Sequence, residues 1–312
     1  MNFALALVLT WQSAGLTGVN VNALLFDGGN LYAATDSGIF VRAGGSEWTA
    51  LNAGSFDAIA ADPRQPLVLY AGGSGVFKSS DGGQHWTAIN QGLPSSSIDV
   101  SSIVIDNQSN IYLGTRGYGI FQSFDGGTRW IERPTGITGF IITFAVDPTN
   151  SATVYAGSNR GVLKSTDSGN TWKQVNNGIT IPSSITSIVI DPSSPSTIFA
   201  ATPFAAVFRT DDGGESWVPI SNGIRSNWVS ALALQNRTTV YAGTPSLGIF
   251  RSTDRGATWV VFNDGLPNGF IHALLLAPSG SQLYAATSSG VFAVDFAPRS
   301  RAVRRYLSLT GM

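Results

Sequence analysis

The stretch from Ser165 to Trp172, STDSGNTW, combines a hydroxyl, a carboxylate, a glycine and a tryptophan at fixed offsets, and close variants of it recur along the chain. The variants are SSDGGQHW at 79–86, SFDGGTRW at 123–130, TDDGGESW at 210–217 and STDRGATW at 252–259. A degraded copy, VRAGGSEW at 41–48, has Ala43 where the others have aspartate. Such regular recurrence indicates a chain built from repeated structural units.

A short strand-like segment with an aromatic residue in its second position also recurs, once in each unit. The aromatic positions are Tyr32, Tyr70, Tyr112, Tyr155, Phe199, Tyr241 and Tyr284, at steps of 38 to 44 residues. Each unit has room for four short strands, and no helical periodicity of 3.6 residues is present, which is typical of a propeller blade. The sequence therefore predicts an all-β fold, a seven-bladed β-propeller of four-stranded antiparallel blades.

The tryptophans predict how the ring closes. Six of them open the fourth strand of a blade: Trp48, Trp86, Trp130, Trp172, Trp217 and Trp259. The seventh unit ends at Phe296 without a tryptophan, while Trp11 lies upstream of the first unit. We therefore expect the Trp11 segment to complete the last blade, which removes an open sheet edge. On this interpretation residues 1–296 form a single propeller, and 297–312 form a basic C-terminal tail.

Composition excludes several classes of function. Charged residues make up 12% of the chain, about half the usual ~25%. The formal net charge is −1, so no face basic enough to bind nucleic acid is expected. The chain has no cysteine, which excludes disulfides, thiolate metal sites and a cysteine nucleophile. We expect no cofactor and no metal site.

The N-terminal residues 3–10, FALALVLT, are apolar but too few to span a bilayer, so no integral membrane span is expected. Two interpretations stay open for this stretch: a truncated export signal, or a native strand that adjoins Trp11. We expect a monomer that works outside the cytoplasm, either periplasmic or secreted.

In the repeated phrase, the glycine can adopt the positive φ of a tight hairpin turn, and the aspartate can accept hydrogen bonds from the amides of that turn. A catalytic carboxylate would not need five equivalent copies. We therefore interpret these carboxylates as structural and expect the tryptophan to fill the space between blade sheets. The five carboxylates are those of Asp81, Asp125, Asp167, Asp212 and Asp254.

These phrases resemble the Asp-box, or BNR, repeat, whose pattern is S/T-x-D-x-G-x-T/S-W. The resemblance covers nearly all of residues 9–296 and implies a β-propeller. Asp-box propellers are similar across sialidases, xyloglucan-degrading glycosidases, sortilin-type receptors and photosystem II assembly factors, so the fold alone does not imply an activity. The sialidase comparison further implies a Phe/Tyr-Arg-Ile-Pro motif, which this sequence lacks.

Propellers usually bind ligands on the face formed by the D–A and B–C loops, where A to D are the strands of a blade in chain order. The residues that we expect to bind a ligand there are Arg116, Tyr118, Phe140, Arg160, Phe204, Trp228, Phe270 and His272. Aromatic faces flanked by arginines suit a sugar, a peptide segment or a carboxylated ligand. The alternative is that these residues only pack loops against each other.

A second set of residues, one from each A strand, should approach the mouth of the central channel. The set is Asn22, Asp57, Ser101, Ile142, Thr186, Ser230 and His272. Asp57 and His272 could form a proton-transfer pair, or the ring could line a polar, water-filled channel.

A glycoside hydrolase is the alternative to a binding module. The phrase LYAATDSGIF at 31–40 resembles the stretch that carries a catalytic aspartate in the xyloglucan-degrading enzymes, and this aspartate would be Asp36. Asp57 or Asp99 could supply the second acid. Those enzymes place their second acid on another propeller, and this chain has one. We therefore expect a non-catalytic binding or assembly module, without catalytic residues, that recognises a glycan or a protein segment.

Overall fold

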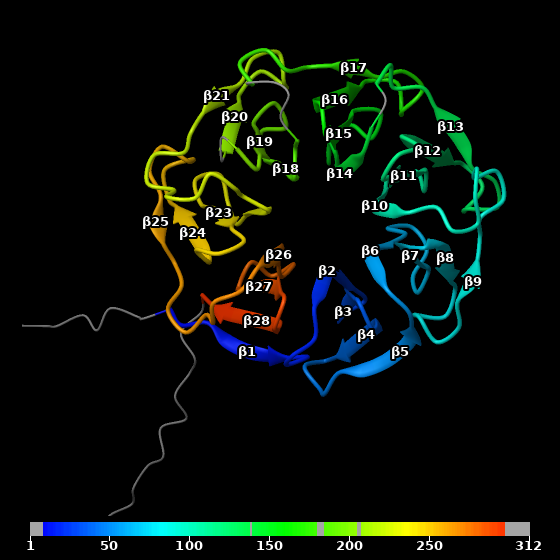
Figure 1. Cartoon of the computed structure of the whole chain (residues 1–312), viewed down its shortest axis with the longest axis horizontal. Helices are drawn as coiled ribbons and strands as arrows, with labels where there is room; N and C mark the ends of the chain where they lie inside the picture. Colours follow the sequence, from blue (N-terminus) through cyan, green and yellow to red (C-terminus); the bar gives the residue numbers. More distant parts are fainter. Residues whose placement is uncertain (1–8, 138, 180–183, 205–206, 297–312) are drawn as a thin grey trace, which may run out of the picture.

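The computed structural model describes residues 9–137, 139–179, 184–204 and 207–296. They form seven four-stranded antiparallel sheets arranged as a ring, with no helix among the described residues (Figure 1). This confirms the predicted seven-bladed propeller. The predicted basic tail, 297–312, and most of the apolar N-terminal stretch lie outside the described residues.

The first four blades follow the chain in order. Blade 1 contains β2 (Val21–Asp27), β3 (Asn30–Thr35), β4 (Gly38–Ala43) and β5 (Thr49–Ala53). Blade 2 contains β6 (Phe56–Ala61), β7 (Leu69–Gly73), β8 (Gly75–Ser79) and β9 (Thr87–Ala88). Blade 3 contains β10 (Val100–Ile105), β11 (Ile111–Thr115), β12 (Ile120–Ser123) and β13 (Ile131–Arg133). Blade 4 contains β14 (Ile141–Val146), β15 (Val154–Ser158), β16 (Gly161–Ser165) and β17 (Lys173–Gln174).

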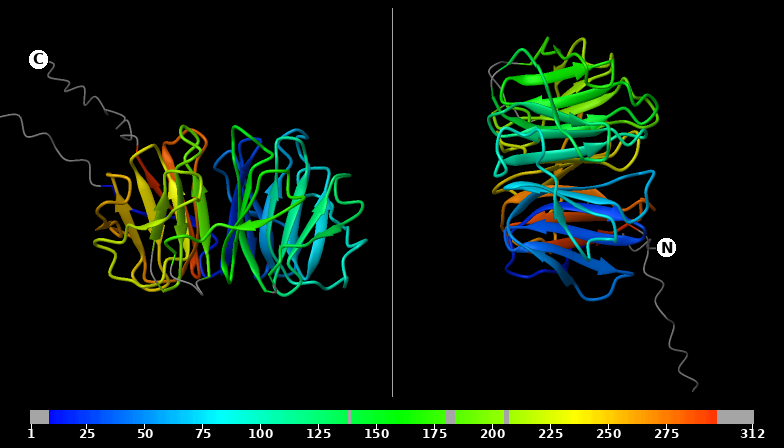
Figure 2. Two further views of the ribbon diagram at one scale, coloured as in Figure 1. Left: turned by 90° about the horizontal axis from the view of Figure 1, so that it is seen from above. Right: turned by 90° about the vertical axis from the view of Figure 1, so that its right-hand side faces the viewer.

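The last three blades complete the circle. Blade 5 contains β18 (Ser187–Ile190), β19 (Ile198–Ala201), β20 (Val207–Thr210) and β21 (Val218–Pro219). Blade 6 contains β22 (Ala231–Leu234), β23 (Val240–Gly243), β24 (Ile249–Ser252) and β25 (Val260–Val261). Blade 7 contains β26 (Ile271–Leu276), β27 (Gln282–Thr287), β28 (Gly290–Asp295) and the N-terminal β1 (Gln12–Gly15). The edge-on views show strands running between the two faces of a disc (Figure 2).

The N-terminal strand closes the ring, as the position of Trp11 predicted. Strand β1 pairs antiparallel with β28, with Gln12 opposite Ala293. The Trp11 side chain is 2% exposed and packs edge-on against Phe262 with ring centroids 5.9 Å apart. Blade 7 thus has strands from both ends of the described chain, and β1 pairs the outer edge of β28.

The core lies between neighbouring blades, which explains why the B strands are apolar on both faces. All of β7, β11 and β15 is buried. The recurring tyrosine places its ring in this core and its hydroxyl at the boundary: Tyr155 Oη donates to the carbonyl oxygen of Gly213 in the next blade at 2.9 Å. Burial raises the pKa of Tyr155 to about 12. Tyr32 and Tyr70 donate in the same way to the carbonyl oxygens of Gly82 and Gly126 in the next blade, so three of the seven aromatic positions join blades as well as filling the core.

The repeated phrase forms the hairpin turn between strands C and D. In the copy from Ser165, the serine hydroxyl donates to Oδ1 of Asp167 at 2.8 Å and accepts from the amide of Gly169 at 2.8 Å. Oδ1 of Asp167 also accepts from the amide of Thr171 at 2.8 Å, and the hydrogen bonds from Thr171 lower the pKa of Asp167. The same network occurs around Asp81, Asp125, Asp212 and Asp254.

The tryptophans of the repeat fall into two groups. Five indole nitrogens donate to a carbonyl oxygen in or just after the outermost strand of the preceding blade: those of Trp11, Trp48, Trp130, Trp217 and Trp259. Trp86 and Trp172 instead donate to Gly83 and Gly169 in their own turns, at 2.8 and 3.1 Å. The boundaries between blades 1 and 2 and between blades 3 and 4 therefore lack this cross-blade hydrogen bond.

Candidate binding site

Five A strands carry a β-bulge at the residue that faces the central axis. The strand pairing skips Asn22, Asp57, Ser101, Ile142 and His272. A bulge leaves one residue out of the ladder and re-aims its side chain. These residues, with Thr186 and Ser230 from the other two blades, line one cavity of about 250 Å³ on the axis. The structure thus brings together all seven residues of the second predicted set.

Four of the seven bind the next blade. The hydroxyl of Thr186 donates to the carbonyl oxygen of Val229 at 2.6 Å. Nδ2 of Asn22 donates to the carbonyl oxygen of Phe56 at 3.0 Å. Ser101 and Ser230 donate in the same way to Ile141 and Ile271. These four side chains join neighbouring A strands. Within the described part of the chain, Asp57, Ile142 and His272 make no such bond, so they are the distinctive members of the ring.

Arg116 joins two of the candidate acids. Its Nη1 lies 2.6 Å from Oδ2 of Asp57 and 2.7 Å from Oδ1 of Asp99. Asp57 belongs to blade 2, whereas Arg116 follows β11 in the B–C loop of blade 3 and Asp99 precedes β10. Sequence reasoning assigned the arginine to ligand binding and the aspartates to a hydrolase. The structure places the three groups in one charge-paired cluster at the channel mouth.

Asp36 is held by two amides. Asn22 Nδ2 donates to its Oδ1 and Asn20 Nδ2 donates to its Oδ2, each at 2.8 Å. These hydrogen bonds, the one from Asn22 first, lower the pKa of Asp36. The general acid of a glycosidase needs a carboxyl group whose pKa is raised. Asp36 is therefore poorly suited to that role.

Three aromatic rings pack together near Asp36 and Asp57. The imidazole of His272 stacks on Phe270, with centroids 4.6 Å apart and an interplanar angle of 20°. Phe270 in turn meets Trp228 edge-on at 5.9 Å and 87°. Burial lowers the pKa of His272 in spite of the opposing effect of Asp36 and Asp57. Nε2 of His272 is buried without a hydrogen-bond partner among the described residues.

Large side chains are exposed in the D–A and B–C loops. Trp228 is 45% exposed, Phe140 48% and Phe204 75%. Tyr118 and Leu247 are exposed on the B–C loops of blades 3 and 6. Arg160 lies in the B–C loop of blade 4, where its carbonyl oxygen accepts from Asn176. The predicted ligand-binding residues thus lie in D–A and B–C loops of blades 3 to 7, except His272, which lies in β26 and lines the axial cavity.

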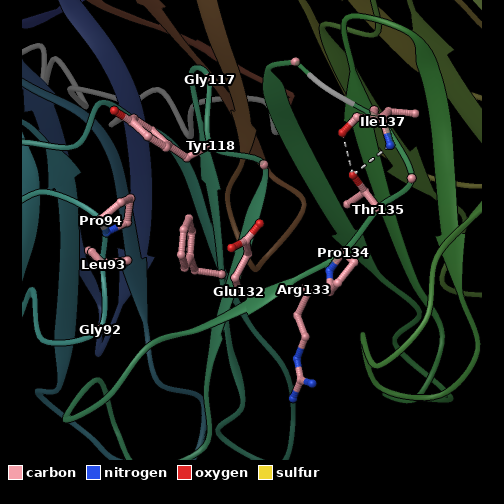
Figure 3. Close-up of a pocket in the computed structure, with 14 residues that line it drawn as sticks. Gly92, Leu93, Pro94, Gly117, Tyr118, Glu132, Arg133, Pro134, Thr135 and Ile137 are labelled. Carbon is pink, nitrogen blue, oxygen red and sulfur yellow. Dashed lines mark hydrogen bonds between the residues drawn. The ribbon is translucent and has the colours of Figure 1, made fainter.

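A second cavity, of about 670 Å³, lies on blade 3 (Figure 3). Of its lining residues, only Tyr118 belongs to the predicted ligand-binding set. The lining is Gly92, Leu93, Pro94, Gly117, Tyr118, Gly119, Phe121, Glu132, Arg133, Pro134, Thr135, Gly136, Ile137 and Gly139. It combines the D–A loops on both sides of blade 3 with the B–C loop and the outermost strand of that blade.

One substitution in the repeat marks this cavity. Four residues after the tryptophan, blades 2, 4 and 6 have Asn90, Asn176 and Asn263, whose side-chain oxygens accept from a backbone amide of strand C at 2.6 to 2.8 Å. Blade 3 has Pro134 there, which offers no side-chain acceptor. The segment that follows β13 is therefore not held to strand C in this way, and the proline in the repeat was the available signal.

Among the described residues, no cluster of histidine, aspartate or glutamate side chains is suited to hold a metal ion. None of the described segments forms a helix that could cross a membrane.

Solved structures share this fold. The GH74 enzyme of Niastella koreensis has a TM-score of 0.73 and 19% identity, covering 93% of this chain and 54% of that one. The extracellular domain of BT4673 from B. thetaiotaomicron has a TM-score of 0.76 and 14% identity, covering 91% and 40%. YCF48 bound to D1 peptide has a TM-score of 0.72 and 16% identity, covering 94% and 98%. This chain thus spans about half of the GH74 enzyme and less than half of the BT4673 structure.

A comparison with curated protein sequences finds no match. A family model described as the DUF6242 beta propeller domain matches residues 8–201, which is more than half of the chain. The match runs from the segment that closes blade 7 to the second strand of blade 5. The chain belongs to the DUF6242 beta-propeller domain family.

Proposed function

We propose that this propeller is a non-catalytic binding module that captures an extended protein segment on its D–A/B–C loop face. The observation that carries the proposal is the exposure of Trp228, Phe140 and Phe204 in loops of this face. Exposed apolar groups that gather on one face mark interaction sites, and tryptophan is enriched among the residues that contribute most to binding.

A protein segment fits this face better than a glycan does. The exposed groups include the aliphatic Leu247 as well as aromatic rings. Phe270 has one ring face against His272 and makes a T-shaped contact with Trp228, so at most one of its ring faces is free for a sugar. The cluster of Arg116, Asp57 and Asp99 supplies fixed charges of both signs beside the apolar groups, a combination that suits a polypeptide with polar and apolar side chains.

The contacts of the candidate acids do not favour a glycoside hydrolase. Asp57 and Asp99 are ion-paired to Arg116, and the amides that bind Asp36 stabilise its charged form. A glycosidase would need one carboxyl group to hold a proton near neutral pH. This argument supports the binding role over the catalytic alternative.

Two details of the proposal draw on similarity. YCF48, which has this fold, was solved with a D1 peptide bound, and that precedent supports a protein partner here. BT4673 uses this fold in an extracellular domain, which supports a location outside the cytoplasm. We also propose that the five repeated turns are Asp-box repeats, because each has the same hydroxyl–carboxylate–amide network.

Parallel peptide and glycan arrays probed with the purified chain test the proposed function. We expect capture of peptides that contain apolar residues and no capture of glycans. Capture of glycans without peptides would contradict the proposal. Release of reducing sugar from an oligosaccharide panel would contradict its non-catalytic part.

A further inference from the structure

The cavity on blade 3 offers a second site whose chemistry differs from that of the channel mouth. Its walls carry apolar groups from Leu93, Pro94, Phe121, Pro134 and Ile137. Its volume, about 670 Å³, lies within the range of roughly 300–1,000 Å³ that is typical of ligand pockets. A side chain or a short peptide could therefore enter it.

The cavity presents one negative charge. The carboxylate of Glu132 has no hydrogen-bond or ion-pair partner within the part of the chain that the structure describes. Glu132 is exposed and lines the cavity together with Phe121, and Figure 3 shows its side chain among those of the lining. The other charged residue of the lining, Arg133, does not balance it. Nε of Arg133 donates to Oε1 of Gln122 at 2.9 Å, and its guanidinium lies 5.3 Å from the centroid of the Phe124 ring. In Figure 3 the guanidinium points away from the other lining side chains.

An aromatic ring stands on the rim. Tyr118 is 52% exposed, and the flanking Gly117 and Gly119 both adopt positive φ, 123° and 76°. Glycine at these two positions permits the backbone turn that carries Tyr118 outward. The exposed ring can contact the aliphatic stem of an incoming side chain, or a cation, over its face.

The boundary between blades 3 and 4, beside the cavity, is open near Gly136. At Gly136, nothing lies within 4 Å of the position that a Cβ atom would occupy. At Gly178, the equivalent residue of blade 4, the same position lies 2.0 Å from the carbonyl oxygen of Trp217. The indole of Trp172 in blade 4 donates to Gly169 in its own turn and not to blade 3. The space beside Gly136, after β13, is therefore free for a segment of a partner.

We propose that this cavity binds a basic side chain of a partner protein segment, with the cation at Glu132 and the aliphatic stem against Tyr118 and the two prolines. Arginine is preferred to lysine because its planar guanidinium can meet a carboxylate with two parallel hydrogen bonds. The proposal adds a specificity pocket to the proposed function, on which it rests for the nature of the partner. A segment on the loop face would place its basic residue over blade 3.

The test uses the full chain and two capped tripeptides, Ac-Ala-Arg-Ala-NH2 and its citrulline analogue, which has nearly the same shape without the charge. Binding is followed by NMR through the backbone amides of Gly117, Gly119 and Gly136. We expect the arginine peptide to shift these amides and the citrulline peptide to bind at least about tenfold more weakly, as for loss of a charged hydrogen bond.

Variants locate the charge that recognises the peptide. Glu132→Gln should weaken binding of the arginine peptide about tenfold, and Tyr118→Leu should weaken it to a smaller extent. Glu47→Gln removes an exposed carboxylate from blade 1 and should leave binding unchanged. Equal affinity for the two peptides, an unaffected Glu132→Gln variant, or no shift of these glycines at millimolar peptide would each overturn the proposal.

A separate variant distinguishes this site from the channel mouth. Trp228→Ala should leave binding of the arginine tripeptide unchanged, because Trp228 does not line the cavity. If array peptides lose binding with Trp228→Ala while the tripeptide is never bound, the proposed function stands and the pocket assignment is wrong. If the tripeptide binds at Glu132 and no array peptide is captured, the proposed function fails by itself.

Discussion

The carbonyl oxygen of Trp217 lies 2.0 Å from the point where a Cβ atom on Gly178 would stand, so blades 4 and 5 meet at a position that only glycine can occupy. Gly178 has a φ of +93°, and the amide of Trp217 donates to the neighbouring carbonyl of Asn177 at 2.8 Å. The same close approach occurs at Gly92, Gly223 and Gly265. These contacts join four pairs of neighbouring blades near their outer strands.

Replacing Gly178 by alanine should therefore destabilise the ring by more than about 3 kcal/mol, since a backbone shift is required. The matched control is Gly136→Ala. Gly136 also has a positive φ, +70°, but nothing lies within 4 Å of the position that its Cβ atom would occupy. The control should lose only about 1–2 kcal/mol, the cost of the left-handed conformation. Urea denaturation of both variants measures the difference, and equal losses would contradict the role of the close approach.

The two groups of tryptophans should differ in stability. Trp130 donates to Ile89 across a blade boundary at 2.6 Å and is 2% exposed, whereas Trp172 donates within its own turn. Trp130→Phe should cost about 1–2 kcal/mol more than Trp172→Phe, because it leaves a carbonyl group of the neighbouring blade unsatisfied. Thermal and urea unfolding of the pair check this. A larger loss of unfolding free energy for Trp172→Phe than for Trp130→Phe would contradict the stabilising role of the cross-blade hydrogen bond.

Ring closure depends on Trp11. This side chain is 2% exposed and donates to the carbonyl oxygen of Phe262 at 2.9 Å. Trp11→Ala should cost about 3–5 kcal/mol, the usual loss for a buried tryptophan, and should increase hydrogen exchange in β1 and β28 before the rest of the ring. Uniform exchange across all blades would show that the closing strand is no weaker than the others.

His272 should make stability fall on mild acidification. Burial lowers its pKa in the folded protein, so the unfolded chain binds the proton more readily. The stability that depends on the neutral imidazole is present above the unfolded pKa of about 6.5. It is lost as the pH falls through the lower folded value. Asp36 also has a lowered pKa. The stability that depends on its charged form is lost only as the pH falls below its ordinary pKa of 3.8, outside the interval in which His272 titrates.

The measurement is the free energy of unfolding between pH 7.5 and pH 5 for the native chain and for His272→Phe, which keeps a ring against Phe270. We expect the variant to lose less stability over this interval than the native chain. Titration of the His272 ring protons by NMR should give a midpoint below 6.5. A midpoint above this value, or identical pH slopes, would contradict the effect of burial.

The fold could be predicted from the sequence because the same turn and strand pattern recurs from blade to blade. A turn that needs a hydroxyl, a carboxylate and a glycine is visible in STDSGNTW, and the unmatched Trp11 indicated the closing strand that β1 supplies. The two groups of tryptophans were not predicted. The cross-blade bonds join residues far apart in the sequence, such as Trp130 and Ile89.

The candidate site was predicted in part. The residues of the channel ring could be located by counting along the repeat, since each A strand presents the same position to the axis. Their partners could not, because contacts such as Arg116 with Asp57 join residues 59 apart in the chain. The cavity on blade 3 could not be predicted because Pro134, which lines it, stands out only against the asparagines of blades 2, 4 and 6 and their bonds to strand C.

The most direct test of the central claim compares capture of array-selected peptides by the native chain, Trp228→Ala and Phe124→Ala. Phe124 is 50% exposed but lies in a C–D turn, on the opposite face. Calorimetric titration should show at least about tenfold weaker binding for Trp228→Ala, as for an interface tryptophan, with a nearly unchanged melting temperature and no effect of Phe124→Ala. Full binding by Trp228→Ala, or loss of binding by Phe124→Ala alone, would contradict capture on the D–A/B–C loop face.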